Sequence, residues 1–443
     1  MDDVGRISLA TDEISISERS WLMFFVRQAI IFVILISVVG LALFQLEMWA
    51  TGGNVPFQPS MLTLLAAVCS LPIALKYRVG QNSLIPAVGL LCGYILIDAM
   101  VLITASDLSL REVRGSFSFI VMILLVSIAP SFDARITDRD VYPLLLIFFV
   151  ACGSLTLLQY VMNDPIVSVV SNDRTLSVPS YIFQGHVRGF GFCVSAFQAG
   201  LFYCFTACVG VALWKKRRQK FYGGALLLVS VACCWATLTR LVFLALLFSV
   251  ISTFLLGLKL RLKMLKVLIP LVGLLLGMVI FWQGAGITGG SGRTDIMSTG
   301  TLNQRIVEDG FYALLYAKGS VRQILLGQGM APWTERSADR LSNAAPIEMD
   351  NAYLQILLSI GLVGLLVVGV VLSLTWLKLL RRAERSSSAI TLAAAGVFSA
   401  IPFIGVIDGF PIALTLLAAI PLCYSDKHFH SQEDAPSKGL VHL

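Results

Sequence analysis

Residues 191–214 read GFCVSAFQAGLFYCFTACVGVALW and contain no charged side chain, and KKRRQK follows directly at 215–220. A helix that crosses the hydrocarbon core of a bilayer needs about 20 mostly apolar residues. Lysine and arginine collect on the cytoplasmic side of such helices. The stretch therefore predicts a membrane-spanning helix whose C-terminal end faces the cytoplasm.

The whole chain has the composition of a membrane protein. Of its 443 residues, 57% are hydrophobic and 13% are charged, against about 45–50% and about 25% in soluble globular proteins. The mean hydropathy is +0.84. So few charges cannot cover the surface of a soluble protein of this size. This excludes a soluble enzyme, a disordered chain and a nucleic-acid binder, even though the net charge is +7.

We expect an all-α, polytopic membrane helix bundle with about twelve transmembrane helices. The predicted spans are residues 28–46, 60–76, 84–104, 115–130, 142–163, 191–214, 221–239, 241–258, 267–285, 351–376, 389–407 and 409–424. No cleavable signal peptide is visible, and the first span should act as an uncleaved anchor.

The spans divide the chain into five regions. They are a cytoplasmic tail (1–27), transmembrane helices one to nine (28–285) with an outer segment at 164–190, a large outer loop (286–350), helices ten to twelve (351–424) and a second cytoplasmic tail (425–443). With the N-terminus inside, most basic residues fall in the inner segments, which is the expected orientation signal. The long outer loop has apolar residues at helical spacing within 303–326, which predicts a helical lid on the membrane.

The cysteines and histidines argue against a metal site. All nine cysteines lie in apolar runs, which is typical of small buried hydrophobic residues. Their number is odd and none has metal-ligand spacing beside a histidine, so neither a disulfide framework nor a zinc site is predicted. Three of the four histidines lie in the tail after Asp426. We expect no metal and no cofactor.

The basic residues of the outer segments are almost all arginine. They are Arg111, Arg114, Arg174, Arg188, Arg240, Arg293, Arg305, Lys318, Arg322, Arg336 and Arg340. The planar guanidinium group suits phosphate. Taken singly, each arginine has a simpler interpretation, because outer loops need charge for solubility. Taken together, they suggest a phosphate-binding face.

Three polar sites stand out at predicted outer helix ends. They are residues 186–192 (HVRGFGF), 237–240 (TLTR) and 348–355 (EMDNAYLQ). Two alternatives remain open: Arg240 as a turn arginine that reaches the lipid headgroups, and Asp350 or Asn351 as a helix cap. If the bundle brings the sites together, Arg188 and Arg240 could clamp a diphosphate, and a carboxylate could take a proton from a sugar hydroxyl.

The order of these motifs resembles the O-antigen ligase and Wzy-type polysaccharide polymerase family, integral membrane glycosyltransferases of the GT-C type. The resemblance covers about residues 180–376. It rests on RGFGF at 188–192, Thr239-Arg240 in a tight turn, LGQG at 326–329, and DNAYLQ at 350–355 followed by Gly361. The family's ligases have histidine at the position of Asp350, and the repeat-unit polymerases are more varied there, which favours a polymerase.

The resemblance implies an undecaprenyl-diphosphate-linked oligosaccharide as both donor and acceptor, in the inner membrane, with chemistry at the periplasmic face. Arg188 and Arg240 would hold the diphosphate, and Asp350 would be the base, with His186 as a second candidate. Candidate substrate-binding residues are Arg305, Arg322, His186, Asn351, Tyr353, Trp333 and Tyr181. A chain-length regulator protein is a further expected partner.

Two other functions remain open. A ligase would transfer the finished O-antigen to lipid A core. A flippase or other transporter would also fit twelve spans with both termini inside. Transporters usually have two related halves and polar groups at mid-membrane, whereas this chain has few intramembrane charges, Asp98 among them, and concentrates its polar motifs on one face.

Overall fold

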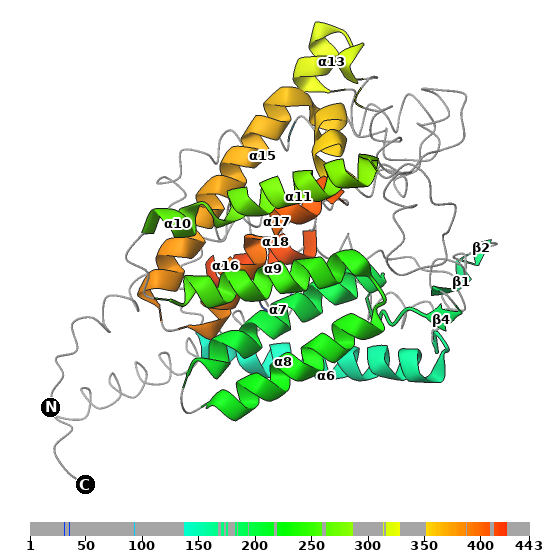
Figure 1. The fold of residues 1–443 in the computed structure, drawn as a ribbon, viewed down its shortest axis with the longest axis vertical. Helices are drawn as coiled ribbons and strands as arrows, with labels where there is room; N and C mark the ends of the chain where they lie inside the picture. The colour runs from blue at the N-terminus through cyan, green and yellow to red at the C-terminus, as the bar shows by residue number, and fades with distance from the viewer. Residues whose placement is uncertain are drawn as a thin grey trace, which may run out of the picture.

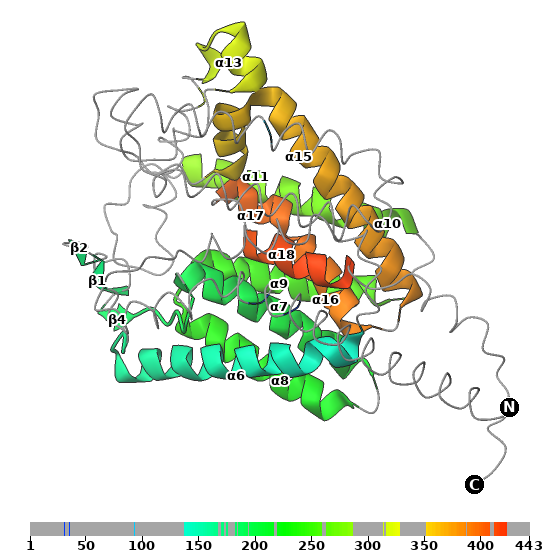
Figure 2. The ribbon, with the colours of Figure 1, turned by 180° about the vertical axis from the view of Figure 1, so that it is seen from behind.

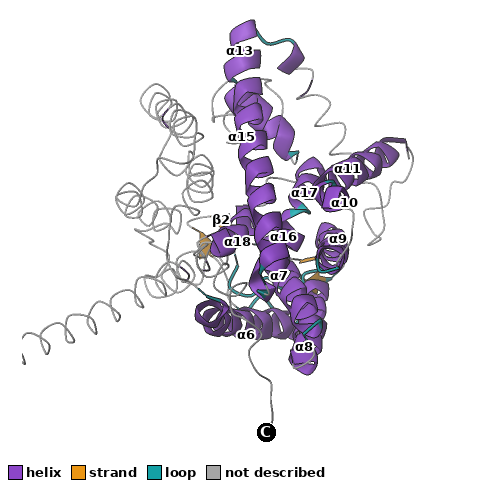
Figure 3. Ribbon diagram, turned by 90° about the vertical axis from the view of Figure 1, so that its left-hand side faces the viewer, coloured by secondary structure: helices purple, strands orange, loops and turns teal. Residues whose placement is uncertain are grey.

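The computed structural model describes the chain mainly from residue 137 onward. The described residues are 31, 35, 93, 137–166, 170–171, 174–175, 182–183, 185–193, 195–216, 219–258, 263–286, 313, 316–327, 351–386, 388–407 and 412–422. In this part of the chain 84% of the residues are helical (Figure 3). The first four predicted spans fall outside these ranges, apart from positions 31, 35 and 93.

A helix lies over each predicted span from 142–163 onward (Figure 1). The helices are α6 (Asp138–Met162), α7 (Ala196–Trp214), α8 (Lys220–Ala236), α9 (Arg240–Leu256), α10 (Lys263–Val267), α11 (Ile269–Gly286), α13 (Val321–Leu326), α15 (Ala352–Arg385), α16 (Ala389–Phe398), α17 (Ile401–Ile407) and α18 (Ile412–Leu422). Two antiparallel hairpins depart from the all-α expectation: β1 (Val170–Ser171) with β2 (Arg174–Thr175), and β3 (Ile182–Phe183) with β4 (His186–Val187).

The described helices agree with a membrane bundle. Four helical stretches are long and apolar enough to cross a membrane: α6, α7, α15 and the α16–α17 pair. Large apolar side chains on α6, among them Leu146, Ile147 and Val150, are more than half exposed. A soluble protein does not leave such a stripe in water, whereas lipid tails solvate it.

Helix α7 forms the centre of the bundle and is buried on nearly every side. It packs against α8, α9 and α16, and its Phe202, Tyr203 and Phe205 are fully buried. The six cysteines on the described residues are buried and not disulfide-bonded. For these six, the prediction that they are small core residues is confirmed.

Successive helices reverse direction, so the bundle has two ends. At one end, which we call the basic end, the first residues of α6 and α16 meet: Ser388 Oγ donates to Asp138 Oδ1 (2.5 Å). At the opposite end, which we call the motif end, α6, α8 and α17 finish and α7, α9 and α15 begin. The motif end carries β4 and lies to the right in Figure 1 and to the left in Figure 2.

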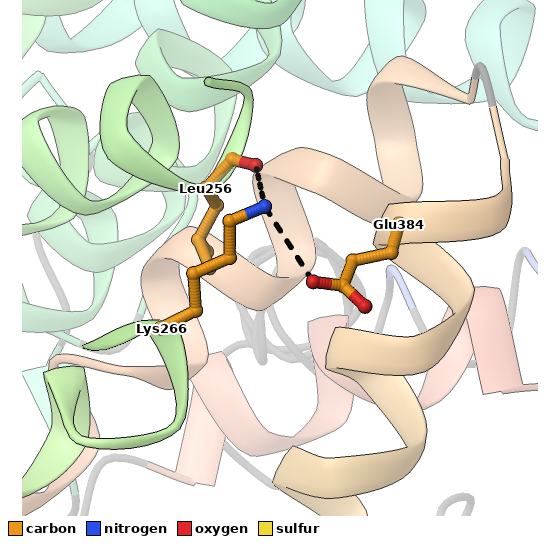
Figure 4. Close-up of polar contacts among 3 residues, drawn as sticks. All are labelled: Leu256, Lys266 and Glu384. Atoms are coloured by element: carbon orange, nitrogen blue, oxygen red, sulfur yellow. Dashed lines mark hydrogen bonds and ion pairs between the residues drawn. The ribbon is translucent and has the colours of Figure 1, made fainter. Parts of the chain in front are cut away.

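The basic end is held by lysines that cap α9. Lys266 Nζ donates to Leu256 O (3.3 Å) and lies 3.5 Å from Glu384 Oε1 of α15 (Figure 4). Lys215 Nζ donates to Phe254 O (2.5 Å). Cations at a helix C-terminus are favourable because of the helix dipole. Burial lowers the pKa of Lys215 below its ordinary value, and the charge of Lys266 lowers it further.

The helical segment predicted at 303–326 is interrupted where the structure describes it. A turn and bend at Lys318 and Gly319 separate the helical positions 316–317 from α13. Ser320 starts α13 with a capping box: its Oγ accepts from Gln323 N (3.3 Å), and Gln323 Oε1 accepts from Ser320 N (2.8 Å). The glycine and the new cap make a restart more favourable than a continuous helix.

Candidate functional site

The Arg188 segment is fastened to the turn that carries Arg240. Arg188 follows β4, and the main-chain N–H of the next residue, Gly189, donates to Ala236 O at 2.8 Å. Ala236 is the last residue of α8, and Arg240 is the first of α9. One hydrogen bond thus joins two residues that are 47 positions apart in the sequence, one within the 186–192 motif and one directly before the 237–240 motif. Both arginines are half-buried, and the Nε atom of Arg188 lies inside the protein.

The α8–α9 turn is a compact, internally bonded structure. Thr237 Oγ1 donates to Cys234 O (2.7 Å), and Thr239 Oγ1 donates to Thr237 O (3.0 Å). Leu238 adopts a left-handed backbone conformation with φ of 47°, which costs a non-glycine residue about 1–2 kcal/mol. The turn holds the start of α9 in one place. Both threonine hydroxyls donate hydrogen bonds to nearby main-chain carbonyl groups.

Arg240 stands at an electrostatically unusual position. The N-terminus of a helix carries a partial positive charge, so a cation there is unfavourable by about 0.3–1 kcal/mol. The first turns of α7 and α9 contain no acidic residue. An anion bound at this place would be favoured both by the guanidinium group and by the helix dipole.

Gln159 of α6 binds the backbone next to Arg188. Its Oε1 accepts from Phe190 N and from Gly191 N, each at 2.9 Å. Its Nε2 donates to Pro165 O (3.0 Å) and to Gly191 O (3.4 Å). The side chain is fully buried. Gln159 therefore satisfies main-chain groups on both sides of its amide and fixes the segment between Arg188 and α7.

The last turn of α6 also holds β4. Asn163 ends the helix in a left-handed conformation, accepts from Val187 N at Oδ1 (2.7 Å) and donates from Nδ2 to Gly185 O (2.9 Å). His186 is exposed, and its ring stacks on Tyr160 with the centroids 6.2 Å apart. The candidate base His186 thus lies at the motif end, beside the Arg188 segment.

Two glycines allow the Arg188 segment to lie against α6. A Cβ atom at Gly189 would come within 2.6 Å of Thr156 O, and one at Gly191 within 2.7 Å of Cys152 O. Gly191 also has a positive φ of 58°, which favours glycine. The two glycines of the RGFGF pattern therefore have a direct steric reason in this chain.

The start of α15 is a capped helix terminus tied to α17. Asn351 Oδ1 accepts from Tyr353 N (3.0 Å) and Leu354 N (3.1 Å), so the helix-cap interpretation of Asn351 is confirmed. Its Nδ2 donates to Val406 O (3.1 Å), and Tyr353 OH donates to Pro402 O (3.2 Å). Both predicted substrate-binding residues thus lie at the motif end, with these polar groups engaged in the fold.

A second pair of motifs meets at a break in α15. Gly361 departs from helical geometry with φ of 69° and ψ of −172°, and Gly327, at the end of α13, has φ of 81°. A Cβ atom at Gly361 would collide with the main chain of Leu325 and Gly327, and one at Gly327 with that of Ser359 and Ile360. Gly327, the first glycine of the LGQG motif, therefore packs directly against Gly361 and the residues before it.

The remaining predicted residues are placed only in part. Arg322 is exposed on α13. Asp350, Arg305, Trp333 and Tyr181 lie outside the described residues, so their roles stay predictions. Among the residues that the structure describes, no group of three or more His, Cys, Asp or Glu side chains is placed to hold a metal ion.

Sequence reasoning missed Gln159, Asn163 and Thr156, although a signal was present. The three polar residues recur at i, i+3 and i+7 in the last turns of an otherwise apolar span, which places them on one helix face. No protein-family model matches the chain, and no curated protein matches it.

Proposed function

We propose that this chain is a polymerase of a bacterial surface or secreted polysaccharide. It is an inverting, metal-independent glycosyltransferase that moves a glycan from a polyprenyl diphosphate onto a hydroxyl of another lipid-linked repeat unit. The observation that carries the proposal is the Gly189–Ala236 hydrogen bond, because it puts the Arg188 segment beside the Arg240 turn at one end of the bundle.

The two arginines act on the diphosphate. Their guanidinium groups form charge-assisted hydrogen bonds to its oxygens, each worth about 1.5–3 kcal/mol. Negative charge grows on the diphosphate as the anomeric bond breaks, and preorganised cations lower the barrier most when they face the place where charge develops. The N-terminus of α9 adds its dipole at the position of Arg240.

The acceptor hydroxyl is activated by a base. Its oxygen attacks the anomeric carbon while the bond from that carbon to the diphosphate oxygen breaks, and its proton goes to Asp350. His186 is the alternative base. A single displacement inverts the anomeric configuration. Arg305 and Arg322 contact phosphate or acidic sugars, Tyr181, Trp333 and Tyr353 stack on sugar rings, and Asn351 fixes the start of α15 beside the base.

The proposed location is the inner membrane, with both termini in the cytoplasm and the motif end facing the periplasm. The clustering of lysines and arginines at the basic end supports this orientation, since positive charge is retained on the cytoplasmic side. Donor and acceptor then enter from the outer leaflet, and a chain-length regulator is the expected protein partner.

Deleting the gene from its host separates the candidate functions. The surface glycan is separated by size on a gel, and the lipid-linked intermediates are extracted. Loss of long chains with single repeat units retained on lipid A or on the lipid carrier supports a polymerase. Accumulation of long lipid-linked chains would instead identify a ligase, and repeat units trapped on the cytoplasmic side a transporter.

Point variants then test the site. Arg188→Ala and Arg240→Ala should each abolish long chains while the protein still inserts in the membrane at its normal level. Arg381→Ala, which removes an exposed arginine from the basic end of α15, should leave the polymer unchanged. Normal polymer in both the Arg188 and the Arg240 variants would exclude the proposed diphosphate clamp.

A further inference from the structure

We infer that Gln159 is the positioning residue for Arg188 and that it sets the affinity of the site for the diphosphate group. This inference rests on the proposed function. Gln159 lies in the last turns of α6, outside the motifs that suggested the site. Its role would be to hold the main chain from which the Arg188 guanidinium group projects.

Gln159 forms hydrogen bonds to the main chain just after Arg188, at Phe190 and Gly191, and to Pro165 in the stretch that follows α6. The side-chain oxygen receives the N–H groups of Phe190 and Gly191, and the side-chain nitrogen reaches the carbonyl groups of Pro165 and Gly191. Buried main-chain groups must be paired, and a buried donor that loses its acceptor is left with its desolvation penalty. Gln159 is fully buried, so water cannot easily replace it.

Gln159 supports the segment after Arg188, while Asn163 binds Val187 N and Gly185 O before it. On one side the segment is bonded to α8 through Gly189 N and Ala236 O (2.8 Å). On the other side Gly189 and Gly191 lie against the main chain of α6, at Thr156 and Cys152. Gln159 thus fixes the position of the segment along the axis of α6. The hydrogen bond from Gly189 to Ala236 fixes the distance of the segment from the Arg240 turn.

Such a support matters because an arginine clamp works only when its geometry is set in advance. A side chain that is held in place before the ligand arrives loses less freedom on binding. Residues that orient a ligand-binding group through hydrogen bonds therefore change affinity without touching the ligand. Gln159 would contribute to diphosphate binding entirely through Arg188.

The test is a double-mutant cycle on the purified full-length protein, with undecaprenyl diphosphate as the probe. Binding is measured for the wild type, Gln159→Leu, Arg188→Ala and the double variant. Gln159→Leu should weaken binding about tenfold, and the double variant should bind no more weakly than Arg188→Ala, because the two residues act as one unit.

A matched control removes a buried hydrogen bond elsewhere. Thr375 is buried near the other end of α15, where its Oγ1 donates to Val371 O (2.8 Å), so Thr375→Val should bind the probe as the wild type does. If Gln159→Leu does not yield folded protein, Gln159→Asn keeps the amide, is one methylene too short, and should also lose affinity.

The outcomes separate the two proposals. Unchanged affinity in Gln159→Leu or Gln159→Asn, or losses that add in full in the double variant, would overturn the positioning role while leaving the proposed function intact. If Arg188→Ala itself bound the probe normally, the diphosphate clamp would fail first, and the role of Gln159 would fail with it.

Discussion

Arg240 is the first residue of α9, and it follows a turn whose two threonine hydroxyls donate to Cys234 O of α8 and to Thr237 O. A cation at a helix N-terminus opposes the helix dipole. The turn also contains Leu238 in a left-handed conformation. An anion bound beside Arg240 would offset the unfavourable interaction of its charge with the helix dipole.

The shape of the Arg240 side chain should matter as well as its charge. Arg240→Lys keeps a positive charge but loses the planar guanidinium group, a shape that can contact two phosphate oxygens at once. We expect a loss of undecaprenyl diphosphate affinity of at least about tenfold, measured on purified protein. Affinity equal to the wild type would mean that Arg240 supplies only general charge.

Gly191 is the residue whose replacement should most directly disturb the Arg188 segment. Gly191→Ala forces a Cβ onto Cys152 O and an L-residue into positive φ, for a cost of at least about 1–2 kcal/mol. We expect a lower melting temperature for the purified protein together with loss of long chains. Gly224→Ala is the control, because a Cβ there meets nothing within 4 Å.

At the scale of elements, α15 is two helical arms joined at Gly361. The short arm begins at Asn351, the cap tied to α17, and the long arm ends at Arg385 on the basic end. The predicted span, 351–376, is shorter than the helix because Lys378, Arg381, Arg382 and Arg385 are charged. The helix continues past the apolar run, and there Arg382 Nη1 donates a hydrogen bond to Pro421 O.

Helix α13 and Gly327, which belong to the long outer loop, pack against α15 at its break. Gly361→Ala should separate α13 from α15, because the new Cβ would collide with the main chain of Leu325 and Gly327. We expect faster hydrogen exchange in residues 321–326 and a loss of long chains. Gly369→Ala lies on the same helix where a Cβ meets nothing, and it should leave both unchanged.

If residues 321–326 exchange at the wild-type rate in the Gly361 variant, the close approach of the two glycines does not hold the loop. Gly327→Ala gives an independent check from the other side of the contact, because its Cβ would meet the main chain of Ser359 and Ile360. Both variants should show the same change in exchange.

At the scale of the whole molecule, the proposal requires the two ends of the bundle to face opposite compartments. Single cysteines placed at Gln219 and Val321, both exposed, can be labelled in intact spheroplasts with a membrane-impermeant maleimide. Val321→Cys should react from outside, and Gln219→Cys only after the membrane is opened. The reverse pattern, or labelling of both from one side, would contradict the orientation.

The sequence by itself determined the helical membrane architecture over the described residues, because the length and apolarity of a span are local properties of the chain. It also singled out Arg188, Arg240 and Asn351, whose charge or polarity contrasts with an apolar background. The helix-cap role of Asn351 could be read locally as well, since a cap involves only neighbouring residues.

Only the tertiary structure decided which motifs meet. The bond from Gly189 to Ala236, the three hydrogen bonds of Gln159 to Phe190 and Gly191, and the close approach of Gly327 to Gly361 all join segments distant in sequence. Apolar periodicity says which residues face neighbours or lipid, but it carries no information on which helix lies alongside which. That choice depends on how side chains and glycines fit together in three dimensions.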